Sequence, residues 1–397
     1  MSEWPTVKLG QVAEFINGDR GKNYPSEGDF ADQGIPFINA GHLTNGEVSF
    51  SNMNYINERR FRLLGSGKTR QNDILYCLRG SLGKTAIVRE NDDAAIASSL
   101  VIIRPSDDCS VGYLYHFLTS PFGHVEMRKF DNGSSQPNLS ANSVKSYLLP
   151  LPPLAEQRRI SEVLDRAEAL RANRRAALAQ LDCLTQSLFL DLFGDPATNP
   201  KGWPTITLGD ALVAIRNGVN AVQRTEPGGW PITRIETIAD GTINMQRVRW
   251  IEPDDSLTDG FQLQPGDILF SHINSVEHIA KTALYSGEPP RLIHGINLLR
   301  LRPELDSVEP VWLLHLLKHD VVRTHFRTRC KRAVNQASLN QPDIKSLETF
   351  LPPLPSQREF ARRVTAVEKL KTAHRASLAE LDALFAALQH RAFRGEL

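Results

Sequence analysis

Two glycine-rich stretches contain the lysine and hydroxyl residues of a phosphate-binding loop, but neither has the spacing that such a loop requires. The stretch Gly65-Ser66-Gly67-Lys68-Thr69 has Arg62 at the position where the first glycine of the motif must stand. The stretch Gly80-Ser81-Leu82-Gly83-Lys84-Thr85 has Leu78 at that position. The sequence therefore gives no support to a nucleotide-binding site.

Residues that could bind a metal or cleave a bond are equally isolated. His315 and His319 have the spacing of a zinc-binding helix, but Leu316 replaces the glutamate that a zinc protease needs. The triplet Asp343-Ile344-Lys345 has no Pro-Asp pair at nuclease spacing, and no Cys/His cluster has metal-ligand spacing. We therefore expect no metal site.

The motifs of an adenine methyltransferase are also missing from the sequence. Such enzymes have an Asn/Asp-Pro-Pro-aromatic motif and a glycine-rich cofactor loop. Here the Pro-Pro pairs occur as Leu151-Pro152-Pro153-Leu154 and again as Leu351-Pro352-Pro353-Leu354, which lack the polar first residue. The sequence predicts that the chain is not an enzyme and has no catalytic residues.

Basic residues form one group in each half of the chain, and they are candidates for contacts with DNA. Arginine and lysine near turns can bind phosphates or the edge of guanine. The candidate DNA-binding residues are Arg59, Arg60, Arg62, Lys68, Arg70, Arg79, Lys84, Arg323, Arg327, Arg329, Lys331 and Arg332. A solvated surface with ordinary ion pairs is an equally good interpretation of composition alone. If they bind DNA, we expect mostly phosphate contacts, because clustered charges suit a backbone better than single base edges.

Composition indicates a globular, cytoplasmic protein with two or three domains. The chain has 397 residues, of which 41% are hydrophobic and 23% charged. We expect no membrane partner, because no apolar run approaches the ~18–20 residues of a span and no signal peptide is visible. The four cysteines form no disulfide pattern, which indicates a reducing compartment. A net charge of +1 argues mildly against a protein that holds DNA without help.

The most informative feature is an internal repeat of about 200 residues. The sequence 151–158 returns at 351–358, and leucines keep the same spacing through the 40 residues that follow each copy. Upstream, Trp4-Pro5-Thr6 returns as Trp203-Pro204-Thr205. A unit of this size is a whole domain plus a helix. Such a duplication can build a pseudo-two-fold molecule that fits a target made of two half-sites.

Each repeat ends in a predicted helix of about 40 residues, over 154–193 and 354–394. A Pro pair precedes each helix, and apolar residues recur every three or four positions. We expect the two helices to pair antiparallel along this stripe, because either alone would leave it in water. The alternative is that each helix only covers its own domain. The predicted helix-pair interface comprises Leu164, Leu170, Leu178, Leu181, Leu184, Leu188, Val364, Leu370, Leu378, Leu381, Leu384 and Leu388.

The predicted fold class is α+β, with two globular domains separated by a long antiparallel two-helix coiled coil in a pseudo-two-fold internal repeat. Short β-type runs punctuated by turns indicate mainly antiparallel strands in each domain. The predicted boundaries are 1–148 for the first domain, 149–199 for the first helical repeat, 200–349 for the second domain and 350–397 for the second helical repeat.

The layout resembles the specificity subunit of type I restriction–modification systems. The residues that support this are Gln136-Pro137-Asn138-Leu139 followed by the 151–158 motif, and Asn335-Gln336-Ala337-Ser338-Leu339 followed by the 351–358 motif. Asp73-Ile74-Leu75 and Gly266-Asp267-Ile268-Leu269 resemble the family's strand entry. One departure is Pro355-Ser356, where the first copy has Ala155-Glu156.

The resemblance implies a DNA-recognition subunit without chemistry of its own. Each globular domain would be a target recognition domain for one half of a split site in double-stranded DNA. The helices would set the spacing and bind two methyltransferase subunits that use S-adenosylmethionine. Motor–nuclease subunits that use ATP and magnesium would be further partners. The alternatives are a coiled-coil adaptor that does not bind DNA, and a stand-alone restriction enzyme, against which the missing catalytic motifs argue.

Overall fold

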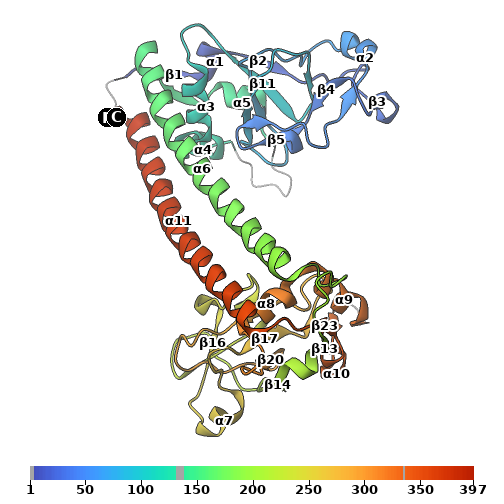
Figure 1. The fold of residues 1–397 in the computed structure, drawn as a ribbon. Helices are drawn as coiled ribbons and strands as arrows, with labels where there is room; N and C mark the ends of the chain where they lie inside the picture. Colours follow the sequence, from blue (N-terminus) through green and yellow to red (C-terminus); the bar gives the residue numbers. More distant parts are fainter. Residues whose placement is uncertain (1–3, 131–137, 334–335) are drawn as a thin grey trace. The chain divides into compact units, whose positions relative to one another are not determined.

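The computed structural model describes residues 4–130, 138–333 and 336–397, and the chain forms two compact units (Figure 1). Unit 1 contains residues 1–176 and 375–397, and unit 2 contains residues 177–374. Each unit thus combines a β-rich domain with one part of each of two long helices, α6 (Leu154–Phe193) and α11 (Leu354–Arg394).

The domain of unit 1 is built on a six-stranded sheet. In spatial order its strands are β2 (Ala13–Asn17), β11 (Leu100–Pro105), β8 (Ile74–Cys77), β9 (Thr85–Ile87), β6 (Glu47–Val48) and β5 (Leu43–Thr44). A second sheet contains β10 (Ala95–Ile96), β4 (Ile35–Ile38), β7 (Tyr55–Ile56) and β3 (Phe30–Ala31). β1 (Thr6–Lys8) pairs with β12 (Leu148–Pro150), so the start of the domain lies beside its end. The pairs β10–β4 and β6–β9 are parallel, whereas the other strand pairs in the described part of this domain are antiparallel.

The domain of unit 2 repeats the central part of this plan. Its main sheet contains, in order, β14 (Leu212–Asn217), β20 (Leu298–Pro303), β17 (Ile268–Ser271) and β19 (Thr282–Leu284). These strands correspond to β2, β11, β8 and β9. The smaller pairings are β13 (Thr205–Thr207) with β23 (Glu348–Phe350), β15 (Trp230–Ile232) with β16 (Arg249–Ile251), and β18 (Ile273–Asn274) with β22 (Gln336–Ser338) and β21 (Lys331–Ala333).

Short helices accompany the main sheet of each unit. In unit 1 the pair α3 (Val111–Thr119) and α4 (Pro121–Arg128) follows β11, and in unit 2 the pair α8 (Pro310–Lys318) and α9 (Asp320–Arg329) follows β20. The central strands β8 and β17 are buried along their whole length and largely apolar, with Ser271 as the polar end of β17, so both of their faces are covered.

Both long helices contribute to the core of each unit. In unit 1, Leu164 of α6 and Phe393 of α11 belong to the core that contains the residues of α3. In unit 2, Phe189 of α6 and Phe360 of α11 belong to the core that contains the residues of α8. Each helix therefore packs on one domain with its N-terminal part and on the other with its C-terminal part.

The bounds of the long helices follow from the residues at their ends. The Pro pairs 152–153 and 352–353 stand just before Leu154 and Leu354, where proline can precede but not continue a helix. Gly194 ends α6 in the left-handed conformation, with φ of +83°, and its amide donates to the Leu190 carbonyl at 2.8 Å. The predicted α+β fold with two β-rich domains and two packed long helices is confirmed. Of the quoted family motifs, Gln136, Pro137 and Asn335 lie outside the described residues.

Candidate functional site

One buried ion pair occurs at the same place in both domains. The guanidinium of Arg104 on β11 donates two hydrogen bonds to the carboxylate of Asp73, at 2.8 and 2.9 Å. Arg302 on β20 donates two to Asp267, both at 2.7 Å. Each aspartate is 1% exposed and immediately precedes the buried central strand. The hydrogen bonds that Arg104 donates to Asp73 raise the pKa of Arg104. Bidentate pairs of this kind hold the start of the central strand in place, at a position that recurs in the sequence repeat.

A repeated glutamine joins the start of each long helix to the adjacent domain. The side chain of Gln157 accepts from the amide of Ser110 at 2.8 Å and donates to the carbonyls of Asp108 and Pro152. Gln357 makes the corresponding three hydrogen bonds, to the amide of Glu309 and the carbonyls of Ser307 and Pro352. Both glutamines are buried. The glutamine that recurs after each Pro-Pro pair is therefore a structural connector.

Ion bridges link α6 to α11 within each unit. In unit 1, Arg171 Nε lies 2.6 Å from Asp382 Oδ1, and the same guanidinium also pairs with Glu168. In unit 2, Lys371 Nζ lies 2.8 Å from Asp182 Oδ1 and 2.8 Å from Glu368. Burial acts to lower the pKa of Lys371, but its hydrogen bonds to the two carboxylates raise it. Arg171 and Lys371 are equivalent in the repeat, as are Asp182 and Asp382, so the same bridge is built twice.

These contacts establish that the paired helices are antiparallel within each unit. Arg159 of α6 donates to the carbonyl of Leu397, whereas Arg171, further along α6, contacts Asp382. In unit 2 the same order holds, because Lys371 contacts Asp182 whereas Phe360 contacts Phe189.

The buried stripe of the helix pair contains only part of the predicted leucine set. Leu164 is 0% and Val364 5% exposed, and both are in the cores. Residues of intermediate exposure are Leu178, Leu181, Leu188, Leu378, Leu381 and Leu388. The prediction is wrong for four leucines, whose exposed fractions are 54% for Leu170, 43% for Leu184, 52% for Leu370 and 49% for Leu384.

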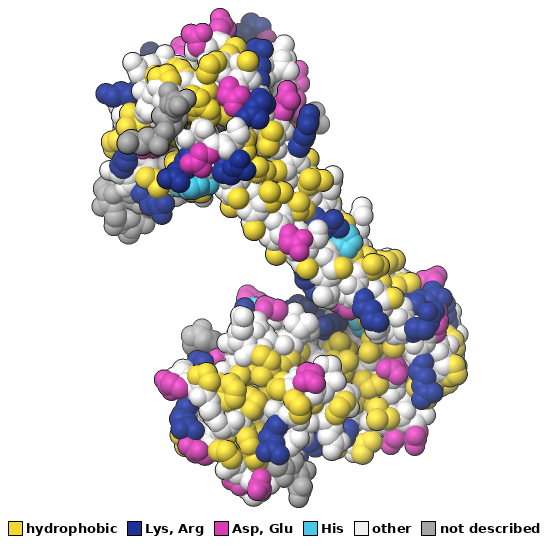
Figure 2. Space-filling view, turned by 90° about the vertical axis from the view of Figure 1, so that its left-hand side faces the viewer, with side chains coloured by type: hydrophobic (Ala, Val, Ile, Leu, Met, Phe, Trp, Pro, Cys, Tyr) yellow, Lys and Arg dark blue, Asp and Glu magenta, His cyan; other side chains and the backbone are white. Residues whose placement is uncertain are grey.

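The physical reason for this correction is the phase of the helix. The side chains facing the partner helix at these heights include Arg171 and Lys371, so Leu170 and Leu370 are rotated about 100° away from them. Figure 2 shows hydrophobic side chains on the visible surface of the paired helices. The four leucines are therefore exposed apolar side chains of the long helices.

The basic candidates of the first domain differ in their freedom to meet a ligand. Arg60 is paired with Asp29 at 2.7 Å, and Arg62 with Glu58. Lys68 lies over the Phe61 ring at 4.9 Å. Arg59 and Arg70 are exposed.

The two candidates that follow β8 are held by the domain itself. Lys84 donates to the Ala40 carbonyl at 2.9 Å, a bond that Lys281 repeats with Ala239 at 2.7 Å. The guanidinium of Arg79, although exposed, donates to Asn138 at 3.2 Å. The repeated lysine bond favours a structural role for Lys84.

The basic candidates of the second domain lie on α9 and β21. Arg327 donates to the Glu277 carbonyl at 2.8 Å, and Arg329 contacts His325 at 2.6 Å. Lys331 and Arg332 are exposed on β21.

Arg323 lines a pocket of about 360 Å³, together with Lys281 and Lys318. The Nε of Arg323 is buried and has no hydrogen-bond partner within the described part of the chain. Burial lowers the pKa of Lys318. The negative charge of Glu368 acts to raise this pKa, whereas the positive charge of Lys371 lowers it further.

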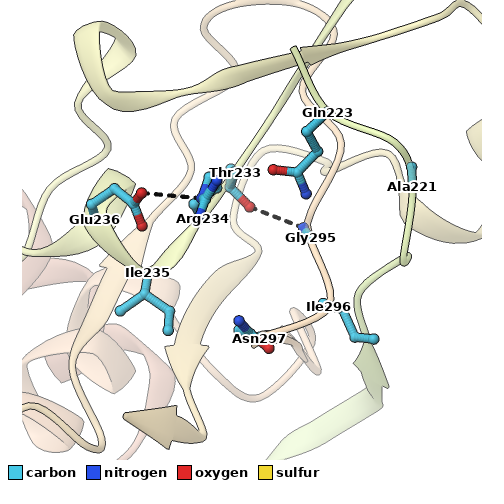
Figure 3. A pocket seen from close by; sticks show the side chains of 9 residues that line it. All are labelled: Ala221, Gln223, Thr233, Arg234, Ile235, Glu236, Gly295, Ile296 and Asn297. Atoms are coloured by element: carbon cyan, nitrogen blue, oxygen red, sulfur yellow. Dashed lines mark hydrogen bonds and ion pairs between the residues drawn. The ribbon is translucent and has the colours of Figure 1, made fainter. Parts of the chain in front are cut away.

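A second pocket of unit 2, of about 310 Å³, was not singled out by the sequence. Figure 3 shows Gln223, Arg234 and Asn297 among its lining residues. The sequence signal that could have indicated it is the divergence of the two repeats directly after Asn17-Gly18 and Asn217-Gly218.

The described part of the chain contains neither a metal-binding cluster nor a membrane-spanning helix. Across residues 4–130, 138–333 and 336–397, no group of three or more His, Cys, Asp or Glu side chains could hold a metal ion. Within the same described part of the chain, no helix has the length and apolar character needed to cross a membrane.

Comparison with known proteins identifies the same duplicated unit. The family described as "Type I restriction modification DNA specificity domain" matches residues 1–181 and again residues 200–383. The specificity subunit of the type I restriction enzyme EcoKI from Escherichia coli K12 is 24% identical over 417 residues, covering 99% of this chain and 89% of the relative. A Methanocaldococcus jannaschii chain described as a candidate MjaX specificity subunit is 46% identical over 173 residues, covering 43% of this chain and 40% of the relative.

Solved structures show the same fold. The type I restriction–modification S subunit from M. genitalium matches with a TM-score of 0.61 at 13% identity, over 99% of this chain and 96% of that one. A chain from a study of the assembly and conformational transition of a type I restriction–modification system also gives 0.61, at 22% identity, over 99% and 98%. The duplicated domains, the paired helices and the two family matches together show that this chain is a DNA specificity subunit of the type I restriction–modification family.

Proposed function

We propose that this chain recognises a bipartite sequence in double-stranded DNA, with residues 1–148 and residues 200–349 each contacting one half-site. The observation that supports this best is that one framework is built twice and bears different loops. The Asp–Arg pair, the lysine–carbonyl bond and the glutamine connector recur, whereas the loops after β2 and β14 share almost no residues. Such a duplication presents two different surfaces on equivalent supports, as a split and asymmetric site requires.

Exposed residues on the helix pair support docking of two methyltransferase subunits. The antiparallel register set by the Arg171–Asp382 bridge places Leu170 and Leu384 at similar heights in unit 1. The equivalent pair in unit 2 is Leu370 and Leu184. Two equivalent apolar patches on one chain suit two copies of the same partner. Substituting serine for Leu170 and Leu384 should weaken capture of one methyltransferase copy and leave the other.

The chemistry of the complex belongs to the partners in this proposal. The methyltransferase subunits would bind S-adenosylmethionine and take the target adenine out of the duplex. Motor–nuclease subunits would use ATP and magnesium for restriction. The assembly would act on cytoplasmic DNA. A near-neutral specificity subunit is compatible with this role, because the partners would share the contacts with the phosphate backbone.

Methylome sequencing of the assembled complex tests the division of labour between the domains. Replacing residues 200–349 by the corresponding domain of a relative should change one half of the methylated motif and leave the other half unchanged. A chain that binds two methyltransferase copies but shows no sequence preference with them would instead be a coiled-coil adaptor.

A matched pair of deletions tests whether the helices set the spacer. Removing residues 172–178 from α6 and 375–381 from α11 shortens the pair by seven residues, or about 10 Å, and keeps the heptad phase. Both ion bridges, Arg171–Asp382 and Lys371–Asp182, remain in the shortened chain. The spacer between the half-sites should shrink by roughly three base pairs at ~3.4 Å per step. An unchanged spacer would show that the helices do not set the distance between the half-sites.

A further inference from the structure

The pocket near the end of β14 has the features of a site that contacts a single base. Its wall is formed by Ala221 and Gln223 from the loop after β14, by residues 233–236, and by residues 295–297 from the loop before β20. Its volume of about 310 Å³ suits the edge of a planar base. Figure 3 shows the amide of Gln223 directed into this pocket, with Asn297 at another side of it.

The amide of Gln223 has an unused hydrogen-bond acceptor. Its Oε1 is buried and has no hydrogen-bond partner among the residues that the structure describes. Buried acceptors are almost always satisfied, so this oxygen indicates a donor that arrives from outside. Asn297 adds a second amide to the same pocket.

The position of the pocket in the repeat supports a role in specificity. Gly18 follows β2 and Gly218 follows β14, so both glycines stand at the same place in the repeat. Each lies against a backbone carbonyl of the loop that precedes the neighbouring strand of the sheet, which is β11 or β20. A Cβ atom added to Gly18 would lie 2.5 Å from the Ala97 oxygen, and one added to Gly218 would lie 2.1 Å from the Gly295 oxygen. This close approach of two backbone segments is therefore common to the two domains.

The side chains that directly follow Gly18 and Gly218 differ between the two domains. In the first domain, Asp19 accepts from the amides of Gly21 and Gly65, and Arg20 donates to the Ser98 carbonyl, so both side chains bind the protein itself. The second domain has Val219-Asn220 at this point, followed by the pocket. Common backbone with different side chains is the arrangement expected where two domains distinguish different bases.

The chemistry of the lining residues favours adenine. Glutamine and asparagine amides can accept from N6 and donate to N7 of adenine in the major groove. Glu236, which could accept from cytosine, is already paired with Arg234 at 3.0 Å. Val222, beside Gln223, is 90% exposed and could meet the methyl group of a neighbouring thymine.

We propose that Gln223, assisted by Asn297, contacts an adenine of the half-site bound by the second domain. This inference rests on the proposed function, because it assigns residues to one of the two recognition surfaces.

The test uses the full chain assembled with the methyltransferase subunit from the same host. Wild type, Gln223→Ala, Gln223→Glu and Asn297→Ala would methylate a pool of duplexes in which every position of the motif is varied. We expect both Gln223 variants to lose discrimination by roughly 5- to 150-fold at one adenine of the second half-site. Asn297→Ala should weaken the same position. The first half-site should keep its full discrimination, which also shows that the complex has folded.

The matched control is Gln246→Ala, because Gln246 is exposed in the same domain and does not line the pocket. It should leave every position unchanged. If the wild-type complex is selective and the Gln223 and Asn297 variants keep that selectivity throughout, the proposed base contact is overturned and the proposed function stands. A wild-type complex without any sequence preference would overturn both.

Discussion

Arg171 of α6 and Asp382 of α11 are joined across the helix pair at 2.6 Å, and the equivalent residues of the other repeat, Lys371 and Asp182, are joined at 2.8 Å. The same bridge therefore occurs in both copies of the repeat. Both cations lie in the buried stripe, where the regular spacing of the helix would otherwise place an apolar residue. Charged pairs at such positions can specify the register of a coiled coil.

Removing one partner of this bridge should lower stability by a small but measurable amount. In Asp382→Ala, Arg171 keeps Glu168 and its contact with the Phe385 ring at 4.3 Å, so we expect a loss of about 1 kcal/mol in the free energy of unfolding. Urea unfolding would measure it. The control is Glu162→Ala, whose pair with Arg166 is exposed and 3.9 Å long and should contribute less than about 0.5 kcal/mol. Equal losses in the two variants would contradict a special role for the bridge.

The buried glutamine connector should be far more sensitive to substitution. Gln157→Leu leaves the amide of Ser110 and the carbonyls of Asp108 and Pro152 without their partner. Because unsatisfied buried groups are costly, we expect a loss of about 2–4 kcal/mol in the free energy of unfolding. Gln180→Leu, on the exposed surface of α6, is the matched control and should change the midpoint little. A connector without structural importance would give two similar unfolding curves.

Exposure should separate two leucines of α6 that lie only six residues apart. Leu164→Ala removes a side chain that is 0% exposed, and we expect a loss of roughly 2–5 kcal/mol from the cavity and the lost burial. Leu170→Ala changes a side chain that is 54% exposed and should stay within about 0.5 kcal/mol of wild type. The two urea midpoints would be compared directly. Similar losses would place Leu170 in the buried stripe after all.

Stability should fall in mild acid because of a histidine on α8. Burial, reinforced by Lys318 and Lys371, lowers the pKa of His315 to about 3, against ~6.5 in the unfolded chain. Between these values only the unfolded chain binds the proton, so stability decreases as the pH falls from ~6.5 toward ~3. At pH 5 the loss from this group should be about 2 kcal/mol relative to neutral pH.

The variant His315→Leu should remove this part of the pH dependence. Unfolding free energies at pH 7 and pH 5 would be measured for wild type and variant. The control His278→Leu replaces an exposed histidine of the same unit and should keep the wild-type slope. An identical slope in His315→Leu would mean that another group is responsible.

The exposed cations on β21 should contribute to DNA binding without affecting sequence preference. If Lys331 and Arg332 contact phosphates, replacing both by alanine should weaken binding of the assembled complex to all sequences and lower the salt slope by about two units. The control is Arg247→Ala, because Arg247 is paired with Asp240 at 2.9 Å. A loss confined to one base position would indicate base contact, and no loss would indicate a solvated surface.

Much of the architecture could be predicted from the repeat. The Pro-Pro pairs and Gly194 mark helix bounds in the sequence, and the structure begins and ends α6 at Leu154 and Phe193 as expected. These signals are local, because proline and glycine restrict the backbone where they stand. The buried strands after Asp73 and Asp267 could be predicted for the same reason.

The exact face of the helix pair could not be predicted from the leucines. Leu170 and Leu184 fit the spacing of three or four residues that a helix face requires. Arg171 nevertheless occupies the buried side at that height, because its guanidinium pairs with Asp382 and lies over the Phe385 ring. The sequence alone does not bring these partners, 211 positions apart, to the same place. The pocket around Gln223 is not predicted for a similar reason, because its walls come from three separate segments, 221–223, 233–236 and 295–297.

The division of the helices between the units has a consequence for biosynthesis. Unit 2 is one continuous stretch, residues 177–374, whereas unit 1 needs residues 375–397 to complete its core. Phe393 is 2% exposed and packs against Tyr113 and Phe117, with ring centroids 5.4 and 5.6 Å apart. On the ribosome the first domain must therefore wait, with part of its apolar surface uncovered, until the last helix has been translated. The half of the protein that is made first is expected to be the half that finishes folding last.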